Sequence, residues 1–395
     1  MGERIYNSKT ECCGCGACAS LCPKSAIKME RDEEGFLYPS INESACVHCG
    51  ICTQNCAFSK RIPSQDFQPQ SFVVRHKDNV IRMNSRSGAI FVCCADYIIK
   101  KGGSVYGCVL NGFVAEHVRA VSMKDVDGMC RSKYIQSDST HVYKKIEEDL
   151  KTGLPVLYTG TGCQVDAVRQ YLKRKRVDDE NFFAMDIVCH GVPSPMLFAE
   201  FVGYLEKKYK GKVSCFEFRD KSICGWDDHI ESFVVNGVKY PSTKWRELFY
   251  TNAISRPSCG NCKYASLNRA GDVTFADAWG VKEAAPEMHD NRGVSSVFVN
   301  TEKGRQLFDA IKKECMVKEV PLSLLLQHNM RAPSSPNVNR AVLWEVYKKN
   351  GIDGLVNAYG RLSFKKRILK KIKYILRKIY YGKKMFLPGF YPLNH

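Results

Sequence analysis

From residue 71 onward, the chain alternates short apolar runs with longer stretches whose apolar residues recur every three or four positions. The short runs predict strands at residues 72–74, 104–110, 155–158, 182–188, 213–218, 272–276 and 296–299. The longer stretches predict helices at residues 87–100, 139–151, 164–175, 195–209 and 301–313. Strands that alternate with helices in this way are typical of an α/β core.

Two of the apolar runs are separated by only two residues. Asn236-Gly237 lies between them and predicts a hairpin over residues 233–240. Because a hairpin joins antiparallel strands, we expect a mixed sheet. Residues 61–70, rich in proline and glutamine, predict a linker. We therefore expect a small domain over residues 1–60, the main α/β domain over residues 71–330, and a helical region over residues 331–395.

Two runs of cysteines precede the linker. The first reads C-x2-C-x2-C-x3-C-P, and the second repeats the spacing without the proline. This is the ligand spacing of bacterial ferredoxins with two 4Fe–4S clusters, in which the fourth cysteine of each run binds the other cluster. The sequence therefore predicts two clusters, one bound by Cys12, Cys15, Cys18 and Cys56 and the other by Cys46, Cys49, Cys52 and Cys22.

Other residues in these runs have distinct expected roles. Gly14, Gly16 and Gly50 let the backbone approach the sulfur atoms and donate N–H groups to them. Cys13 falls outside the spacing and is expected to be a spectator. A pair of zinc knuckles is the alternative, but zinc sites use two spaced cysteine pairs and not two quartets that each end in x3-C.

The cysteine content bears on the compartment. The chain has 20 cysteines among 395 residues, no apolar signal region near Met1, and no run of 18 apolar residues. We therefore expect no signal peptide and no transmembrane helix. Cysteines in such a cytoplasmic chain indicate metal ligation and not disulfides.

The net charge of +18 is unevenly distributed. Residues 361–384 hold eleven Lys and Arg and no acid, so only +7 remains for the rest of the chain. A nucleic-acid-binding protein would be more uniformly basic, which argues against that class. The segment predicts an amphipathic helix that could lie on an anionic membrane surface at the inner face. Docking on the protein's own core, or binding of an acidic partner, is the alternative.

Four more cysteines lie at expected strand ends or turns, where sites are usually built. They are Cys163, Cys189, Cys259 and Cys262. The remaining cysteines are expected to be small buried residues. These are Cys93, Cys94, Cys108, Cys130, Cys215, Cys224 and Cys315.

Four segments together resemble the family of beta subunits of coenzyme F420 hydrogenases and dehydrogenases. They are residues 85–91 (SRSGAIF), 158–164 (YTGTGCQ), 189–194 (CHGVPS) and 257–280, and with the cysteine runs they extend the resemblance over about residues 1–360. The resemblance implies an FAD-binding domain with a third 4Fe–4S cluster close to the flavin. It assigns that cluster to Cys163, Cys189, Cys259 and Cys262. The family usually has Pro at position 162 and Gly at position 89, where this chain has Gly162 and Ala89.

The same resemblance points to a flavin site. Ser87 and Gly88 lie in a loop expected to approach the flavin, and Trp279 and Asp277 are expected to line it or to shape the turn. His190 could move a proton during flavin reduction, because a histidine pKa lies near neutrality, although such a residue more often hydrogen-bonds to the backbone. Independently, a glycine turn between a strand and a helix is a candidate phosphate cradle, here Gly160, Thr161 and Gly162.

These features predict an iron–sulfur flavoprotein oxidoreductase. Clusters pass single electrons, a hydride carrier requires two, and a flavin accepts both modes. The resemblance implies coenzyme F420 as the two-electron partner, although similar bacterial proteins occur beside surface-polysaccharide genes and their substrate is open. A redox partner protein or a ferredoxin is expected at the clusters. The alternative is a non-catalytic electron-relay subunit that docks on a partner enzyme.

Overall fold

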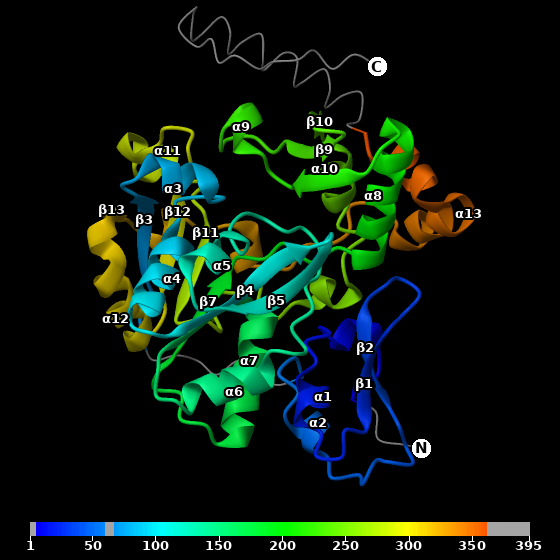
Figure 1. Ribbon diagram of the computed structural model, residues 1–395, viewed down its shortest axis with the longest axis horizontal. Helices are drawn as coiled ribbons and strands as arrows, with labels where there is room; N and C mark the ends of the chain where they lie inside the picture. The colour runs from blue at the N-terminus through cyan, green and yellow to red at the C-terminus, as the bar shows by residue number, and fades with distance from the viewer. Residues whose placement is uncertain (1–4, 60–66, 362–395) are drawn as a thin grey trace, which may run out of the picture.

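The computed structural model describes residues 5–59 and 67–361, an N-terminal lobe packed against a larger α/β domain (Figure 1). The lobe consists of an antiparallel hairpin and two short helices, β1 (Ile27–Arg31), β2 (Leu37–Ile41), α1 (Ala17–Leu21) and α2 (Ile51–Gln54). Each helix begins directly after a glycine with a positive φ, Gly16 at 79° and Gly50 at 68°. Residues with a Cβ adopt this conformation only at a cost, so both glycines are required by the turn.

An eight-stranded sheet forms the centre of the larger domain, in the order β13-β3-β12-β11-β7-β6-β4-β5. Its strands are β3 (Gln70–His76), β4 (Ser104–Asn111), β5 (Val114–Ala120), β6 (Val156–Thr161), β7 (Phe182–Ile187), β11 (Val273–Asp277), β12 (Ser295–Val299) and β13 (Cys315–Glu319). The four central strands β4, β6, β7 and β11 are parallel, and antiparallel strands flank them on both sides. The expectation of a mixed α/β sheet is confirmed.

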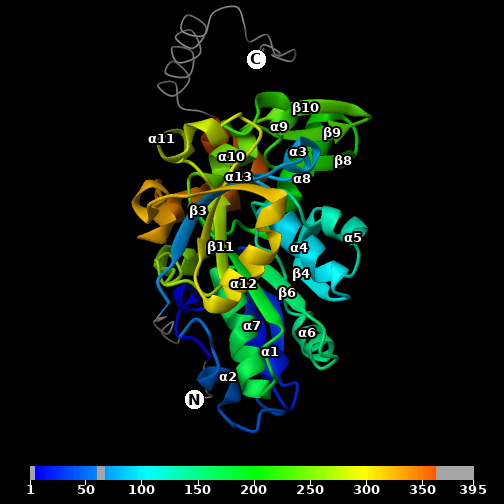
Figure 2. The ribbon, with the colours of Figure 1, turned by 90° about the vertical axis from the view of Figure 1, so that its left-hand side faces the viewer.

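Alternate residues of the central strands face opposite helical layers, which explains their nearly continuous hydrophobicity. On one face, Val156 and Tyr158 pack with α6 (Tyr143–Leu150) and α7 (Gly162–Lys175). On the other face, Leu157 packs with α4 (Ile90–Lys100) and α12 (Glu302–Ile311). Figure 2 shows α7 beside α1, so the first layer also carries the contact with the N-terminal lobe.

A second sheet is separate from the first and has the order β10-β9-β8. It is built from β8 (Val213–Glu217), β9 (Glu231–Val235) and β10 (Val238–Ser242), and it packs on α8 (Pro195–Tyr209), α10 (Lys244–Phe249) and α13 (Arg340–Tyr359) around Phe198, Phe233, Trp245 and Leu355. The predicted Asn236-Gly237 hairpin joins β9 to β10. The hairpin therefore exists but is not the reason that the main sheet is mixed.

The antiparallel strands β5 and β13 were not predicted from the sequence. β5 alternates apolar residues with charged ones and buries His117, which weakens its apolar signal. Only the 3-10 turn Lys312–Glu314 separates β13 from α12, and β13 lies at the edge of the sheet, where only part of its surface is buried. Strand pairing, and not local hydrophobicity, decides both segments.

The remaining elements are short. The helices are α3 (Asn79–Asn84), α5 (Met123–Asp127), α9 (Lys221–Cys224) and α11 (Val281–Ala284). Single 3-10 turns occupy Lys9–Glu11, Pro257–Asn261, Pro286–Met288, Lys312–Glu314, Leu322–Leu324 and His328–Met330. None of the described helices is long and apolar enough to cross a membrane. The predicted basic helix over residues 361–384 lies almost entirely outside the described residues.

The described cysteines form no disulfide bonds with one another. Cys93, Cys94 and Cys315 are buried, and the Sγ atoms of Cys93 and Cys315 lie 3.5 Å apart. Cys108, Cys130 and Cys224 are half-buried. The expectation of burial is wrong for Cys215, which is exposed on β8 because its side chain points away from the apolar cluster beneath the small sheet.

The turn before α4 gives a first test of the fold. Ala89 has φ 67°, and a Cβ on the preceding Gly88 would lie 2.2 Å from the carbonyl oxygen of Val74. Ala89→Gly should stabilise the protein by about 1 kcal/mol, because glycine adopts this φ without steric strain. Gly88→Ala should destabilise it by several kcal/mol, on the order of other overpacked sites. Thermal unfolding of the anaerobically purified protein measures both changes in stability. A destabilised Ala89→Gly variant, or a Gly88→Ala variant as stable as the unchanged protein, would contradict this account.

Candidate functional site

The carboxyl ends of three parallel strands meet at one edge of the main sheet. Thr161 of β6 pairs with Ile187 of β7, and Ile187 pairs with Phe275 of β11. The residues two positions beyond these are Cys163, Cys189 and Asp277. Backbone register therefore places two predicted cluster ligands and a predicted site carboxylate side by side. Open α/β sheets usually bind their ligands at this edge.

Four thiols gather at the β6–β7 end of this edge. The turn Pro257–Asn261 brings Cys259 and Cys262 to Cys163 and Cys189. Burial, together with the neighbouring thiolates, raises the pKa of Cys259 to about 12 and that of Cys262 to about 11. Burial and the neighbouring thiols likewise raise the pKa of Cys189. The set of Cys163, Cys189, Cys259 and Cys262, which we call the core quartet, therefore has the donor chemistry of an iron–sulfur site.

Backbone N–H groups point at the sulfur atoms of the core quartet. The Gly191 N–H donates to Cys189 Sγ at 3.4 Å. Val192 donates to Cys259, and Tyr264 and Ala265 donate to Cys262. Such N–H···S contacts stabilise thiolate charge and tune cluster potentials.

The inner ferredoxin quartet is formed by Cys12, Cys15, Cys18 and Cys56, as the spacing predicts. Their thiols interact across the two cysteine runs, since Cys56 perturbs the pKa of both Cys12 and Cys18. Burial raises the pKa of Cys12 to about 11, and the Arg256 guanidinium opposes that rise. The structure therefore places Cys56, the fourth cysteine of the second run, beside the first three cysteines of the first run.

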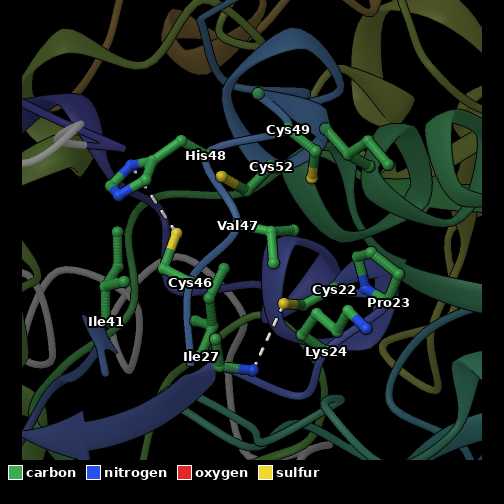
Figure 3. A pocket seen from close by; sticks show the side chains of 13 residues that line it. Cys22, Pro23, Lys24, Ile27, Ile41, Cys46, Val47, His48, Cys49 and Cys52 are labelled. Atoms are coloured by element: carbon green, nitrogen blue, oxygen red, sulfur yellow. Dashed lines mark hydrogen bonds between the residues drawn. The ribbon is translucent and has the colours of Figure 1, made fainter. Parts of the chain in front are cut away.

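The outer ferredoxin quartet, Cys22, Cys46, Cys49 and Cys52, lines one pocket at the surface (Figure 3). The pocket encloses about 430 Å³, including space open to solvent. The Ala26 N–H donates to Cys22 Sγ at 3.3 Å, and Cys49 is solvent-exposed. This quartet is therefore the one that an external electron carrier can approach.

Within residues 5–59 and 67–361, no three His, Cys, Asp or Glu side chains converge closely enough to hold a single metal ion. A 4Fe–4S cluster binds each thiolate through a different iron, so its ligands lie farther apart than those of one ion. The three quartets fit 4Fe–4S clusters in donor type.

The inner and core quartets share one cavity. Cys15 of the first and Cys163, Cys259 and Cys262 of the second line it together with Cys13. The Cys13 thiol hydrogen-bonds to both Cys15 and Cys163 and lowers the pKa of each. Cys13, expected to be a spectator, therefore lies between the two quartets.

Arg256 also lines this cavity and is almost completely buried. Its Nε donates to the Cys12 carbonyl oxygen at 2.7 Å, and its Nη2 lies 3.6 Å from Cys12 Sγ. Its guanidinium also lies 4.1 Å from the Tyr38 ring centroid and donates to Leu37 O at 2.9 Å. Arg256 was not predicted as a site residue, although it lies only three residues before the first cysteine of the CxxC.

The glycine turn at Gly160–Gly162 packs tightly against neighbouring side chains. The Thr161 N–H and hydroxyl both donate to Gln164 Oε1, at 3.1 and 3.0 Å, which forms a capping box for α7. A Cβ on Gly160 would lie 3.2 Å from the His117 ring, and one on Gly162 would lie 3.0 Å from Tyr264. Close packing thus accounts for both glycines, and the phosphate cradle stays a prediction.

Four side chains, those of Asp277, Arg86, Arg219 and Trp226, form a hydrogen-bonded cluster at the β11–β12 end of the same edge, which we call the polar group. Asp277 accepts from Arg219 Nη1 and Trp226 Nε1, both at 2.9 Å, and from Arg86 Nη2 at 3.4 Å. Burial alone would raise the pKa of Asp277, but Arg86 and Arg219 outweigh burial and hold it below its usual value. Asp277 is therefore an ionised carboxylate that orients guanidinium groups, and it is unsuited to donate a proton near neutral pH.

Ser87 and Gly88 hydrogen-bond to the start of β12, next to this polar group. Ser87 Oγ donates to Val294 O at 2.5 Å, and the Gly88 N–H donates to Ser295 Oγ at 2.9 Å. Ser295 pairs with Asp277 across β12 and β11. The structure therefore brings the predicted loop residues to the predicted carboxylate, although they belong to distant segments of the sequence.

Trp279 and His190 lie at the exposed side of the polar group. Trp279 is 44% exposed and stacks on buried Trp226 with ring centroids 5.1 Å apart. The surrounding protein lowers the pKa of His190, with Asp277 opposing that effect. His190 is thus neutral near pH 7. It follows Cys189 directly, so it connects the core quartet to the polar group.

Three residues of the polar group were not predicted as site residues, namely Arg86, Arg219 and Trp226. Arg86 lies inside the resemblance segment at residues 85–91, so its charge next to the loop glycine was a usable signal. Arg219 and Trp226 come from the connection that follows β8. Nothing local distinguishes them from ordinary loop residues.

Two regions of the chain match known protein families. Residues 11–60 match the 4Fe–4S dicluster domain, and residues 154–323 match the family described as the C-terminal part of the coenzyme F420 hydrogenase/dehydrogenase beta subunit. The F subunit of the F420H2 dehydrogenase of Methanosarcina mazei is 22% identical over 78% of this chain and 85% of its own length. An uncharacterized ferredoxin of Methanocaldococcus jannaschii is 32% identical over 14% of this chain and 71% of its own length.

Among solved structures, a chain of the F420-reducing NiFe hydrogenase complex from Methanosarcina barkeri aligns with a TM-score of 0.46 and 16% identity. That alignment covers 81% of this chain and 95% of the other. The sequence matches extend over both the cysteine runs and the sheet edge that holds the core quartet. The chain is thus similar over residues 11–60 to the 4Fe–4S dicluster domain and over residues 154–323 to the C-terminal part of the coenzyme F420 hydrogenase/dehydrogenase beta subunit.

Proposed function

We propose that this chain is an iron–sulfur flavoprotein that exchanges single electrons at three 4Fe–4S clusters for electron pairs at FAD. The observation that carries the proposal is the continuous series of thiol sets. It starts at exposed Cys49, passes through the inner quartet and Cys13, and reaches Cys189 beside His190 and Asp277. One-electron and two-electron chemistry meet at a flavin, which is the reason for placing FAD at the end of the series.

The donor chemistry of each site supports the group assigned to it. The three quartets supply thiolates with N–H donors, which suit 4Fe–4S clusters. The polar group supplies stacked indole rings, two guanidinium groups and a neutral imidazole, which suit a conjugated, partly anionic ring system. FAD, when bound there, would supply the step between single electrons and a hydride.

The chain's own residues have distinct tasks in this proposal. Asp277 holds Arg86 and Arg219 in place and stays ionised. His190 is the group that can take up or release a proton at the exposed side, because its lowered pKa leaves a free nitrogen lone pair near pH 7. The buried Arg256 keeps the inner and core quartets in a fixed relation.

The two-electron partner belongs to the same proposal. The match to a family named for coenzyme F420, and to one subunit of an F420H2 dehydrogenase, supports F420 or another hydride carrier of similar chemistry. Because these similar proteins are subunits, a redox partner protein at the exposed outer quartet is part of the proposal. The competing function is an electron relay without flavin.

Cofactor content separates the two functions. Anaerobically purified protein should contain about twelve irons and about one FAD, since each cluster holds four irons. A Cys259→Ser and Cys262→Ser double variant should lose about four irons, because two ligands of the core quartet are gone. Iron, sulfide and flavin assays check this.

The matched control is a Cys130→Ser and Cys215→Ser double variant, in which neither residue belongs to a quartet. It should retain all the iron. About eight irons and no flavin in the unchanged chain, with no further loss in the Cys259 and Cys262 variant, would refute the flavoenzyme and favour the relay.

Arg256 provides a second test, through reduction potentials. Reduction adds negative charge, which a buried guanidinium stabilises, so Arg256→Gln should make the inner and core cluster potentials more negative by on the order of 50–100 mV. The outer cluster should be unchanged. Potentiometric titration followed by electron paramagnetic resonance measures all three.

Arg340→Gln is the control for this change, because Arg340 also joins the two lobes. It pairs with Glu34 and donates to Ser255 O at 2.9 Å, but it does not contact a cysteine. Its removal should loosen docking and leave all potentials within error. Equal shifts in both variants would mean that Arg256 acts through docking alone.

A further inference from the structure

The polar group at the β11–β12 edge holds more buried positive charge than carboxylates can neutralise. Arg82 is matched by Asp290, which it binds at 2.9 and 2.5 Å. Arg86 and Arg219 share the single carboxylate of Asp277. The two guanidinium groups are 12% and 5% exposed, so water screens the excess charge poorly.

Several N–H donors of these two arginines lack acceptors. Arg86 Nε and Nη1 and Arg219 Nε are shielded from solvent and donate to no hydrogen-bond acceptor. The contacts of Arg86 through Nη2 are long, 3.2 Å to Trp226 O and 3.4 Å to Asp277 Oδ2. Buried donors of a charged group are nearly always satisfied, so their orphaning indicates a missing anionic acceptor.

The positive charge of Arg86 and Arg82 also affects the neighbouring Lys221. Burial, followed by the charges of Arg86 and Arg82, lowers the pKa of Lys221 to about 7. Lys221 Nζ donates only to carbonyl oxygens among its hydrogen-bond contacts, those of Arg82 and Arg292. A bound anion would offset the excess positive charge around Arg86 and Arg219.

The site also has an aromatic wall that reaches the surface. The Arg219 guanidinium lies 5.1 Å from the ring centroid of Trp279, which is 44% exposed. The other stacking partner of Trp279 is buried Trp226. A flat ligand with an anionic group could therefore contact the exposed indole and extend its anion toward the arginines.

We propose that Arg86 and Arg219 form a subsite for the phosphate or carboxylate of an anionic, conjugated ligand. Two sources carry this chemistry, the diphosphate of FAD and an acidic group on the two-electron substrate. Both sources rest on the proposed function, whereas anion binding as such does not. Arg86 is the residue most available to the ligand, because Asp277 retains Arg219 and Trp226 without it.

Inorganic pyrophosphate is the probe for this subsite, measured by calorimetry and by tryptophan fluorescence on anaerobic protein. Saturable binding is expected to the unchanged chain. Arg86→Gln should weaken it at least tenfold, and Arg86→Lys, which keeps the charge, should weaken it less. Arg75→Gln is the matched control, because Arg75 pairs with the neighbouring Asp290 at 3.1 Å and should leave affinity unchanged.

Comparison of FAD-loaded and FAD-depleted protein distinguishes the two sources. Binding only to the depleted protein means that the subsite holds the cofactor's phosphates. Binding to both forms means that it holds the substrate's acidic group. No saturable binding to either form, or equal affinity in Arg86→Gln, would overturn the proposal. Either result is independent of the iron count, so it leaves the flavoenzyme proposal to its own test.

Discussion

Parallel pairing of β6, β7 and β11 determines where chemistry can be placed in this molecule. The register that aligns Thr161, Ile187 and Phe275 also aligns the residues that follow each strand. Cys163 and Cys189 consequently fall on one side of the edge and Asp277 on the other. A slip of one residue would turn every side chain of a strand to the opposite face, which would separate the thiols from each other and from the carboxylate.

Docking of the N-terminal lobe depends on this edge as well. Arg256 lies directly before the CxxC turn, and it binds backbone carbonyls of the lobe at Cys12 and Leu37. A Cβ on Gly14 would lie 2.5 Å from its guanidinium, so this glycine is required for close approach as well as for its φ of 68°. The lobe is thus positioned by hydrogen bonds to backbone atoms, which tolerate little change in distance.

The site combines features that destabilise an isolated fold. Buried thiols, orphaned guanidinium N–H groups and a left-handed Ala89 each cost free energy, and all lie around the same edge. Conflicts of this kind concentrate where a protein binds something, because the bound group supplies the missing partner.

The sequence by itself determined the features whose signals are local. The C-x2-C-x2-C-x3-C spacing predicted which cysteines would meet, the helix over 195–209 was predicted with its observed bounds, and Asn236-Gly237 predicted its hairpin. Only the tertiary structure decided which sheet that hairpin joins, that β5 and β13 pair with the main sheet, and that Cys13, Arg86 and Arg256 reach the site. Spacing along a helix or turn is set by backbone geometry within a few residues. The position of β13 and the burial of a lone arginine instead depend on partners more than a hundred residues away.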